Sequence, residues 1–469
     1  MQDKIDIQRK KILKGNPTID LSDSCRIGNG ISQISEENKS NLLTLYKDIK
    51  SSLDICFFIP ASGSGSRMFS ALYEFLNDPA NPDVQKSVDE FVAHIEEMAI
   101  YYYLSDEWKE KISENNFDKV ELVEYLLTDA GLDLGGLPKG LIPFHIYENY
   151  ITNPFQEHLV QGTQIGDTAS KFHFTINKRF EDRIDSRIKK LERRLNMNFV
   201  WEFSEQDPST NSVAFTDDME PAVDGQGMII TRPAGHGTLI KNLNTIDADI
   251  IFIRNIDNMQ HGAKADTSTK TRQLLAGVLL DFQSKIHNIL KKVERGDAFA
   301  SSMSAFNKEF DMRIPQELIG DEDFVKRYFD RPVRVCGMVK NEGAPGGGPF
   351  WVKMNGNETR QIIEKSQISN NPEQKKLMET ATHFNPVELV CGVRNHKGQK
   401  FDLEQYVDEN QYFIVNKTQE GQAIKYIEQP GLWNGAMAHW LTLFYEIDSA
   451  CFSPVKTVMD LLKPAHRSS

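Results

Sequence analysis

The sequence predicts an α/β fold: a mixed, mostly parallel sheet flanked by helices. The run Leu53–Pro60 (LDICFFIP) is nearly continuous in apolar residues and ends at a turn, which is typical of a strand buried on both faces of a parallel sheet. Segments with apolar residues at three- and four-residue steps lie between such runs. Strands that alternate with helices favour a layered α/β core.

The other elements follow from the same patterns in chain order. Residues 1–44 are polar and mixed, which indicates a helical or irregular lead-in before a core over residues 45–469. Further strands are predicted at Lys171–Ile176, Asn198–Phe203, Met228–Thr231 and Asp249–Ile253. Helices are predicted at Met68–Leu76, Lys178–Asn196 and about Ser268–Glu294. Beyond Pro332 the chain turns strand-rich, so residues 330–469 form a separate C-terminal part of the expected core.

One long stretch is expected to be mostly helical. VDEFVAHIEEMAIYYYL and FDKVELVEYLLTDAGL have helical apolar spacing, which predicts a helical insertion over residues 78–134. A second charged run, RFEDRIDSRIKKLERRL, is most simply the solvated face of a helix.

Composition excludes several classes of protein. The chain has 469 residues and a net charge of −13, whereas a protein that binds along a nucleic acid usually presents a basic face. Small anionic substrates stay possible, because local Lys and Arg can override the global sign. The five cysteines form no CxxC pair, which argues for a reducing compartment and against a zinc site. MQDKIDIQRKK lacks the apolar core of a signal peptide and no run is long enough to span a membrane, so we expect a soluble, cytoplasmic protein.

The segment PASGSGSRM (Pro60–Met68) lies where a predicted strand is followed by a helix. Gly63 and Gly65 have no side chains, so backbone N–H groups beside a helix N-terminus can approach an anion. Arg67 adds a forked donor for phosphate oxygens. No Lys-Ser/Thr pair follows and the third glycine of a dinucleotide fingerprint is absent, so neither of those loops is present. A flexible strand–helix turn without a ligand is the alternative.

Two lysines lie in motifs that could direct a positive charge at a phosphate. In LPKGLIPF, Lys139 stands between a stiff proline and a permissive glycine, although a surface turn also explains this motif. In FSPVKTVMDLL, Lys456 precedes an apolar helical segment, and a helix N-terminus repels cations. A phosphate bound between the lysine and the helix would remove that conflict. The alternative is an exposed lysine beside a docking helix.

The motif PAGHGTLIKNL places Gly235 and Gly237 on either side of His236. The glycines allow a flat ring to lie on the backbone, and the imidazole could hydrogen-bond a base or a ribose. A lone histidine is more often structural or exposed in a turn. The flanking glycines favour a binding site.

The motif FIRNIDN places Asp257 directly after a predicted strand. In open α/β sheets ligands bind beyond the carboxyl ends of the strands. A carboxylate at such an end suits Mg²⁺, which takes one or two protein carboxylates and completes its shell with phosphates and water. An Asx turn that closes the strand is the alternative.

In their order these five motifs resemble those of the UDP-sugar pyrophosphorylase superfamily, which includes the eukaryotic-type UTP–glucose-1-phosphate and UDP-N-acetylglucosamine uridylyltransferases. The family patterns GGxGTR, PKG, PPGHGD, NSDN and FLPVKTTSDLL appear here as SGSGSR, PKG, PAGHGT, NIDN and FSPVKTVMDLL. RQIIEKSQI is similar to the family's LQLLEIAQV, HFNPVEL to its FNTNNLW, and FSEQ to its FxQ displaced by one residue. The resemblance covers about residues 55–465, looks closest to a bacterial family of unassigned function, and implies a Rossmann-like nucleotidyltransferase core.

The resemblance implies a role for each matching residue. The phosphates of a nucleoside triphosphate and a sugar-1-phosphate would be held by Gly63, Gly65, Arg67, Lys139 and Lys456, of which Arg67, Lys139 and Lys456 would be catalytic. The base would contact Gln206, Gly235 and His236. The sugar would contact Asn255, Glu364 and Asn385, so that residues 330–469 would bind the sugar. Asp257 would bind Mg²⁺.

The implied reaction is attack of a sugar-1-phosphate oxygen on the α-phosphorus of a nucleoside triphosphate such as UTP, with loss of pyrophosphate. Three features depart from the family pattern: Ser62 replaces a glycine, some 70 residues separate Arg67 from Lys139, and the chain ends soon after Lys456, which leaves no room for the family's C-terminal β-helix. The alternatives are a non-catalytic nucleotide-sugar binding or regulatory protein on the same fold, and an interaction scaffold.

Overall fold

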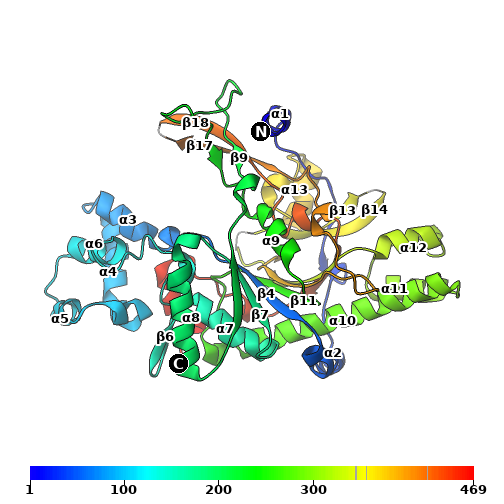
Figure 1. The fold of residues 1–469 in the computed structure, drawn as a ribbon, viewed down its shortest axis with the longest axis horizontal. Coiled ribbons are helices and arrows are strands. Elements are labelled where there is room, and N and C mark those ends of the chain that lie inside the picture. Colours follow the sequence, from blue (N-terminus) through cyan, green and yellow to red (C-terminus); the bar gives the residue numbers. More distant parts are fainter. Residues whose placement is uncertain (344–345, 355, 420, 469) are drawn as a thin grey trace. The chain divides into compact units, whose positions relative to one another are not determined.

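The computed structural model describes residues 1–343, 346–354, 356–419 and 421–468 (Figure 1). The chain forms two compact units, each built from three stretches of sequence. The first unit contains Met1–Cys56, Gln206–Ile253 and Gln273–Ile447. The second contains Phe57–Glu205, Arg254–Arg272 and Asp448–Ser469. No helix in the described part of the chain has the length and apolar character needed to cross a membrane.

The first unit is built on a mixed sheet whose strands run in the order β2-β3-β19-β12-β16-β11. These strands are β2 (Arg26–Ile27), β3 (Gly30–Ser32), β19 (Leu441–Glu446), β12 (Val333–Lys340), β16 (Glu388–Gly392) and β11 (Ile250–Arg254). The pairs β2–β3, β3–β19 and β19–β12 are parallel, and β16 is antiparallel to β12. Val335 of β12 pairs with Val390 on one side and Leu443 on the other, and all three are buried.

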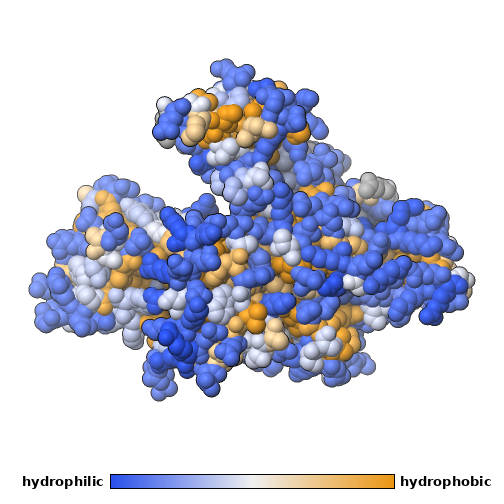
Figure 2. Space-filling model, viewed as in Figure 1, coloured by the Kyte–Doolittle hydropathy of each residue, from blue (hydrophilic) through white to orange (hydrophobic). Residues whose placement is uncertain are grey.

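Helices and smaller sheets complete the first unit. Its helices are α1 (Gln2–Lys14), α2 (Glu36–Ile49), α9 (Ile240–Thr245), most of α10 (Asp266–Arg295), α11 (Ala300–Glu309), α12 (Glu322–Phe329) and α13 (Pro372–Glu379). Its small sheets join β1 (Leu21–Ser24) to β13 (Gly348–Met354) and β14 (Asn357–Ile363), β9 (Ser212–Val213) to β10 (Thr231–Arg232), and β17 (Phe413–Gln419) to β18 (Gln422–Glu428), while β15 (His383–Phe384) pairs with β12. Figure 2 shows apolar residues gathered over β17 and β18, beside a buried cluster that includes Ile5 and Ile12 of α1.

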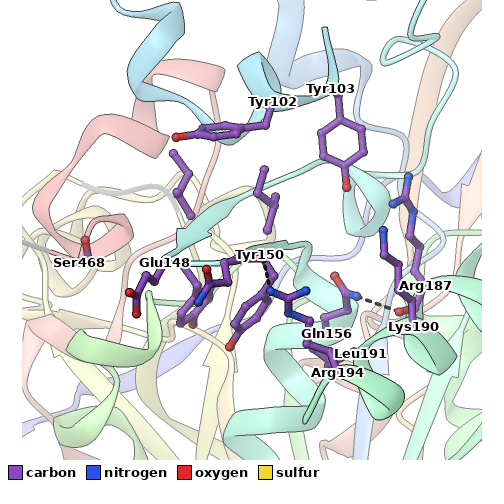
Figure 3. A pocket seen from close by; sticks show the side chains of 14 residues that line it. Tyr102, Tyr103, Glu148, Tyr150, Gln156, Arg187, Lys190, Leu191, Arg194 and Ser468 are labelled. Atoms are coloured by element: carbon purple, nitrogen blue, oxygen red, sulfur yellow. Dashed lines mark hydrogen bonds between the residues drawn. The ribbon is translucent and has the colours of Figure 1, made fainter. Parts of the chain in front are cut away.

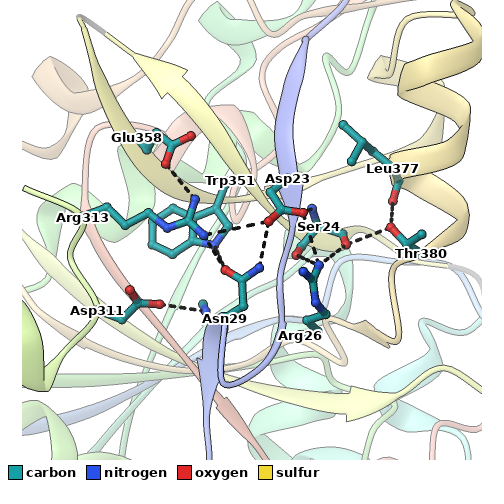
Figure 4. A network of polar contacts seen from close by, with 11 residues as sticks. Asp23, Ser24, Arg26, Asn29, Asp311, Arg313, Trp351, Glu358, Leu377 and Thr380 are labelled. Atoms are coloured by element: carbon teal, nitrogen blue, oxygen red, sulfur yellow. Dashed lines mark hydrogen bonds and ion pairs between the residues drawn. The ribbon is translucent and has the colours of Figure 1, made fainter.

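The N-terminal segment differs from its expected form. A helical or irregular lead-in was predicted over residues 1–44, and α1 and α2 are helices, but β1, β2 and β3 occupy much of residues 21–32. A polar network holds this segment in the first unit (Figure 4): Asn29 Oδ1 accepts from Trp351 Nε1 at 3.0 Å, and the Arg313 guanidinium lies 3.9 Å from the Trp351 ring centroid. Strands of two to four residues are too short to show a period of two, so their sequence pattern could not reveal them.

The second unit contains a three-stranded part of the sheet with helices packed on it. Its strands run in the order β4 (Ile55–Pro60), β7 (Lys171–Thr175) and β8 (Val200–Ser204), and β7 is parallel to β8. Its helices are α3 (Ser70–Asn77), α4 (Pro82–Ala93), α5 (Asp106–Ser113), α6 (Lys119–Leu127), α7 (Pro154–Ile165) and α8 (Glu181–Leu195). A hairpin of β5 (His145–Tyr147) and β6 (Tyr150–Thr152) precedes α7. Gly162 lets α7 approach β7, since a Cβ there would lie 2.3 Å from the Phe172 ring.

The stretch 78–134 is helical, as its apolar spacing predicts, with α4, α5, α6 and short 3₁₀ turns and no strand. The chain returns from it beside the glycine turn, because Gly65 N–H donates to Leu137 O at 3.0 Å and Lys139 N–H donates to Gly63 O at 3.1 Å. That this stretch is an insertion relative to other proteins stays a prediction.

Two predicted elements differ in detail from the structure. Of the strand expected at Met228–Thr231, Thr231 lies in β10 and Ile229 forms an isolated bridge with Val223, while Met228 is 60% exposed at the end of a turn that begins at Asp224. The helical segment predicted after Lys456 is a five-residue 3₁₀ helix, Val458–Leu462. The dipole of a long α-helix therefore does not act on Lys456, and dipole repulsion gives no reason to expect a phosphate there.

Candidate active site

The glycine turn follows β4 in the second unit and lies against the segment that carries Lys139. Ala61 N–H donates to Thr175 O at 2.9 Å, and Ser64 forms an isolated β-bridge with Pro138. A Cβ on Gly63 would meet nothing within 4 Å, whereas one on Gly65 would lie 2.4 Å from Ile142 Cδ1. Gly65 is therefore needed for packing, and the open space at Gly63 leaves its backbone accessible.

The turn leads into a 3₁₀ helix at Ser66–Phe69, and α3 begins only at Ser70. The α-helix N-terminus expected directly after the glycines is therefore displaced along the chain, because the first turn tightens to 3₁₀ geometry. Arg67 is exposed, and its side chain makes no hydrogen bond or ion pair with any described residue. Its guanidinium is thus available to a ligand.

Lys139, Asp257 and Lys456 meet in the second unit at one carboxylate oxygen. Lys139 Nζ lies 2.8 Å from Asp257 Oδ2, and Lys456 Nζ lies 3.0 Å from the same atom. The Asp257 side chain is 9% exposed and that of Lys139 13%, while that of Lys456 is 60% exposed. Two of these residues are therefore held inside the protein, and the third reaches them from the surface.

Backbone pairing fixes this cluster. Val455 N–H donates to Asp257 O at 3.1 Å, and Asn258 forms an antiparallel bridge with Pro454. Lys139 Nζ also donates to Val455 O at 2.5 Å. The Asp460 carboxylate accepts from Lys456 N–H at 2.7 Å, so the backbone on each side of the cluster has little freedom. Segments separated by more than a hundred residues thus hold the two amines on one carboxylate.

The charges of this cluster do not cancel. Burial acts to raise the pKa of Asp257, but the Lys139 and Lys456 ammonium groups outweigh it and hold that pKa below its ordinary value. With the carboxylate ionised, the cluster carries two positive charges and one negative. Together with the exposed Arg67 on the adjoining turn, the arrangement favours a ligand with several negative charges.

The same cluster limits how Mg²⁺ could bind. Among the described residues no three His, Cys, Asp or Glu side chains gather in a group that could hold a metal ion. Asp257 therefore fits Mg²⁺ only as a single protein ligand, with phosphate oxygens and water completing the shell. Because both ammonium groups contact Oδ2, Oδ1 is the oxygen on which such an ion could bind without displacing them.

His236 lies in the first unit and is exposed to solvent. Its Nδ1 accepts from Leu432 N–H at 3.0 Å, and its ring stacks on Trp433 with centroids 4.3 Å apart. Desolvation by these neighbours lowers the pKa of His236, so the imidazole is neutral near pH 7. Nε2 has no partner among the described residues and is the atom left for a ligand.

The glycines around His236 serve different purposes. Gly235 has a φ of 77°, in the left-handed region that glycine adopts readily. A Cβ on Gly237 would lie 2.0 Å from Pro430 O, so this glycine is required by the backbone packed against it. The sequence suggested that both glycines make room for a ring, but local packing explains Gly237 without a ligand.

Glu364 and Asn385 also come together in the first unit, beside Asn434. Burial raises the pKa of Glu364, and a hydrogen bond from Asn434 acts in the opposite direction. Asn385 N–H donates to Gly347 O at 2.9 Å, and a Cβ on Gly347 would lie 3.1 Å from Glu364 Oε1. The structure therefore places two of the three predicted sugar ligands around one backbone position.

The turn after Asn385 is strained. Val387 has a φ of 62°, which is rare for a β-branched residue, and Asn385 Oδ1 accepts its N–H at 3.0 Å. Strain of this kind gathers at functional sites. Nothing in the sequence indicates this strain, because valine is not a residue that marks a left-handed turn.

For two predicted ligands no described contact joins them to their expected partners. Gln206 is half-buried, and its Nε2 donates to Thr210 Oγ1 at 3.5 Å; none of its described contacts is with His236. Asn255 belongs to the second unit, two residues before Asp257, whereas Glu364 and Asn385 belong to the first. Sequence reasoning missed Trp433 and Asn434, although the Pro-Gly and Asn-Gly pairs around them are turn signals.

Comparisons with known proteins agree with this fold. A family profile described as a domain of unknown function, DUF4301, matches residues 1–467. No curated protein matches the sequence. Solved structures similar to this chain include a UDP-N-acetylglucosamine pyrophosphorylase from Trypanosoma brucei in complex with an inhibitor, with a TM-score of 0.50 and 11% identity over 98% of this chain and 74% of that one.

Two other similar structures are a mutant UDP-glucose pyrophosphorylase from Leishmania major in complex with UDP-glucose (TM-score 0.47, 12% identity, 99% and 74% coverage) and a putative UDP-N-acetylglucosamine pyrophosphorylase from Entamoeba histolytica (TM-score 0.44, 11% identity, 92% and 82% coverage). At such sequence identities a structural likeness shows the fold alone, and of these three structures only the one from Trypanosoma brucei reaches a TM-score of 0.50. It confirms the predicted fold class, a mixed and mostly parallel sheet flanked by helices.

Proposed function

Since the chain belongs to the DUF4301 family, whose description assigns no function, we propose from its own residues that it is a nucleotidyltransferase that joins a nucleoside triphosphate to a sugar-1-phosphate and releases pyrophosphate. UTP is the first nucleotide to test, because the similar solved structures are named as UDP-sugar pyrophosphorylases. The observation that carries the proposal is the Lys139–Asp257–Lys456 cluster. It has excess positive charge and lies in the unit that contains the glycine turn.

In the proposed reaction an ionised oxygen of the sugar phosphate forms a bond to the α-phosphorus. The bond from that phosphorus to the bridging oxygen breaks, and pyrophosphate leaves with the electron pair. No general base is needed, because the attacking oxygen is already ionised. Catalysis then depends on in-line positioning and on cations that face the developing charge.

The residues of the second unit would divide that work. Lys139 is fixed by Asp257 and Val455 O, so its amine is already oriented toward a bound phosphate. Lys456 is more exposed and can move from Asp257 to a phosphate oxygen, and Arg67 can contact the triphosphate from the glycine turn. Mg²⁺, held by Asp257 and the phosphates, would supply further neutralisation of their charge. In the first unit we assign the base to Gly235, His236 and Gln206 and the sugar to Glu364 and Asn385; Asn255 of the second unit is assigned to the sugar as well.

Pyrophosphate release with UTP, Mg²⁺ and a panel of sugar-1-phosphates tests this function. We expect Lys456→Ala to lower turnover on the order of a hundredfold or more, because a charge-assisted contact that strengthens in the transition state is lost. Nucleotide affinity should fall far less. Lys463→Ala is the matched control, since Lys463 pairs with Asp460 at 2.7 Å and does not contact Asp257.

Two results would contradict the proposal. Equal turnover in Lys456→Ala and Lys463→Ala would remove Lys456 from the reaction. Nucleotide binding without release of pyrophosphate from the nucleotide, whichever sugar-1-phosphate is added, would favour the non-catalytic binding protein.

A further inference from the structure

One pocket in the second unit is lined by basic and aromatic side chains. It has a volume of about 770 Å³, within the usual range for small-molecule sites. Its walls come from the 3₁₀ turn Ala99–Tyr103, the β5–β6 hairpin and one face of α8. Lys139, Asp257 and Lys456 are not among its lining residues, so nothing here rests on the proposed function.

Three cations of α8 line this pocket: Arg187, Lys190 and Arg194. Their spacing of three and four residues puts them on one face of the helix. No carboxylate lies within ion-pair distance of any of them among the described residues, whereas the neighbouring Lys189 pairs with Asp185 at 2.7 Å. The pocket face of α8 therefore carries uncompensated positive charge.

The arginines are held in place by tyrosine rings. The Arg187 guanidinium carbon lies 5.1 Å from the centroid of Tyr103, and that of Arg194 lies 5.5 Å from the centroid of Tyr150. A guanidinium stacked on a ring keeps N–H groups in its own plane for an anion. The helix dipole accounts for a cation in the last turn, but not for Arg187 and Lys190 in the middle of the helix.

The rest of the lining combines apolar and aromatic side chains with the polar Glu148, Asn149, Gln156 and Ser468. Ile146 and Ile151 are among the apolar residues, and Tyr102 is 53% exposed. Figure 3 shows Tyr102 and Tyr103 on one side of the pocket and Tyr150 across from them, with Arg187 and Lys190 at one end. The carboxylate of Glu148 is at the other end, away from these two cations. The pocket thus has a cationic end and a separate surface suited to a ring.

We propose that this pocket binds a small organic phosphate, with the phosphate on Arg187, Lys190 and Arg194 and the ring against Tyr102, Tyr103 and the two isoleucines. A mononucleotide and a sugar phosphate share this chemistry. Either would make the pocket a second ligand site of the protein, separate from the lysine–aspartate cluster.

Hydrogen exchange of the full chain, measured with UMP, glucose-1-phosphate or inorganic phosphate, locates binding without an activity assay. We expect UMP or glucose-1-phosphate to slow exchange in residues 147–151 and 187–194, and the stronger of the two identifies the ring. Arg187→Gln/Arg194→Gln should weaken that binding at least tenfold. The control Lys189→Gln/Arg193→Gln removes the same charge from residues of α8 that do not line the pocket, and it should leave the binding unchanged.

A second variant keeps the test valid if the arginine pair fails to fold. Tyr102→Ala changes a half-exposed side chain, and it should weaken UMP or glucose-1-phosphate while leaving inorganic phosphate unaffected. The proposal is overturned if no probe protects these segments at millimolar concentration or if both double variants lose binding equally. Inorganic phosphate that protects as strongly as both organic phosphates would overturn it as well.

Discussion

Asp257 accepts hydrogen bonds from two lysine amines on one oxygen, and the proposed phosphate site of the second unit depends on this arrangement. The carboxylate orients both amines but neutralises only one of them. Lys456 is the exposed member of the cluster, so its amine could leave Asp257 and bind a polyphosphate. Asp257 would still be paired with Lys139, so no buried charge would be left without a partner. The cluster is therefore stable without substrate and still able to exchange one contact for a phosphate.

The first residue-scale prediction concerns Asp257→Asn. We expect it to abolish turnover supported by Mg²⁺ while leaving the far-UV circular dichroism spectrum unchanged, because the amide keeps the shape of the side chain but neither binds the metal nor fixes the amines as strongly. The control Asp266→Asn removes an exposed carboxylate, at the start of α10, that pairs with Lys270. Turnover at the normal rate in Asp257→Asn with Mg²⁺ as the sole metal would disprove the metal assignment.

The second concerns the pH dependence of stability through His236. Desolvation lowers its pKa below the ordinary 6.5, so the unfolded chain takes up the proton first as the pH falls. The stabilising contribution of the neutral ring is complete above pH 6.5 and is lost as the pH falls below it, by an amount that solvent screening of this exposed residue keeps small. Protonation of Nδ1 would also break the bond from Leu432 N–H.

His236→Asn isolates this effect, because an amide oxygen can accept from Leu432 N–H without titrating in this range. Urea unfolding of both proteins from pH 7.5 to 4.5 should show the wild type more stable at high pH, with the difference shrinking as the pH falls. A difference that stays constant over this range would mean that the folded protein does not hold His236 neutral.

Much of the residue-scale prediction came from motifs, and the structure tests their placement but not their roles. Lys139, Asp257 and Lys456 were each predicted from weak local signals, and both lysine amines lie within hydrogen-bond distance of Asp257. That both amines share one oxygen could not be predicted, since it depends on a backbone pairing between residues 258 and 454. His236 was identified, but its stacking partner Trp433 follows from long-range packing.

At the scale of elements, Gly63 and Gly237 differ in the space that surrounds them. Gly63 has open space where a Cβ would stand, while a Cβ on Gly237 would meet Pro430 O at 2.0 Å. Gly63→Ala should leave the melting temperature unchanged and lower UTP affinity, because the added methyl group blocks approach to the backbone. Gly237→Ala should cost about 1–3 kcal/mol of stability through overpacking.

Thermal unfolding and a UTP titration of both variants check these expectations, and each variant serves as the control for the other. An unchanged UTP affinity in a stable Gly63→Ala protein would show that the turn does not contact the nucleotide. Unchanged stability in Gly237→Ala would show that Pro430 can move away from it.

Elements with strong periodicity were predicted best. β4 and β11 are largely apolar runs, β7 alternates polar and apolar residues, and α8 and α10 have the apolar spacing of long helices. The positions of these elements agree with the prediction to within a few residues. The failures are at β1–β3 and Met228–Thr231, where pairing with distant strands or a tight turn decides the conformation. Local sequence holds no information on such partners.

At the scale of the whole molecule, the net charge is −13, yet positively charged side chains lie close together in the lysine–aspartate cluster and on the pocket face of α8. Acidic residues elsewhere keep the net charge negative without screening these sites, because the Debye length is only about 8 Å at physiological ionic strength. Local charge, and not the total, therefore decides which ligands bind.

The last prediction follows from that local charge. A ligand that binds only the folded chain stabilises it by about 2.7 kcal/mol at a concentration of 100 times Kd, which raises the melting temperature by several degrees. UTP with Mg²⁺ should therefore produce a clear thermal shift, and uridine at the same concentration a much smaller one, because the three phosphates make the contacts with the cations. Raising the salt concentration should reduce the UTP shift more than the uridine shift. Lys456→Ala should retain most of the UTP shift, since its main loss is in turnover. No shift with any nucleotide, with or without Mg²⁺, would exclude a nucleotide site and favour an interaction scaffold, in which the helices of residues 78–134 would be the first surface to test.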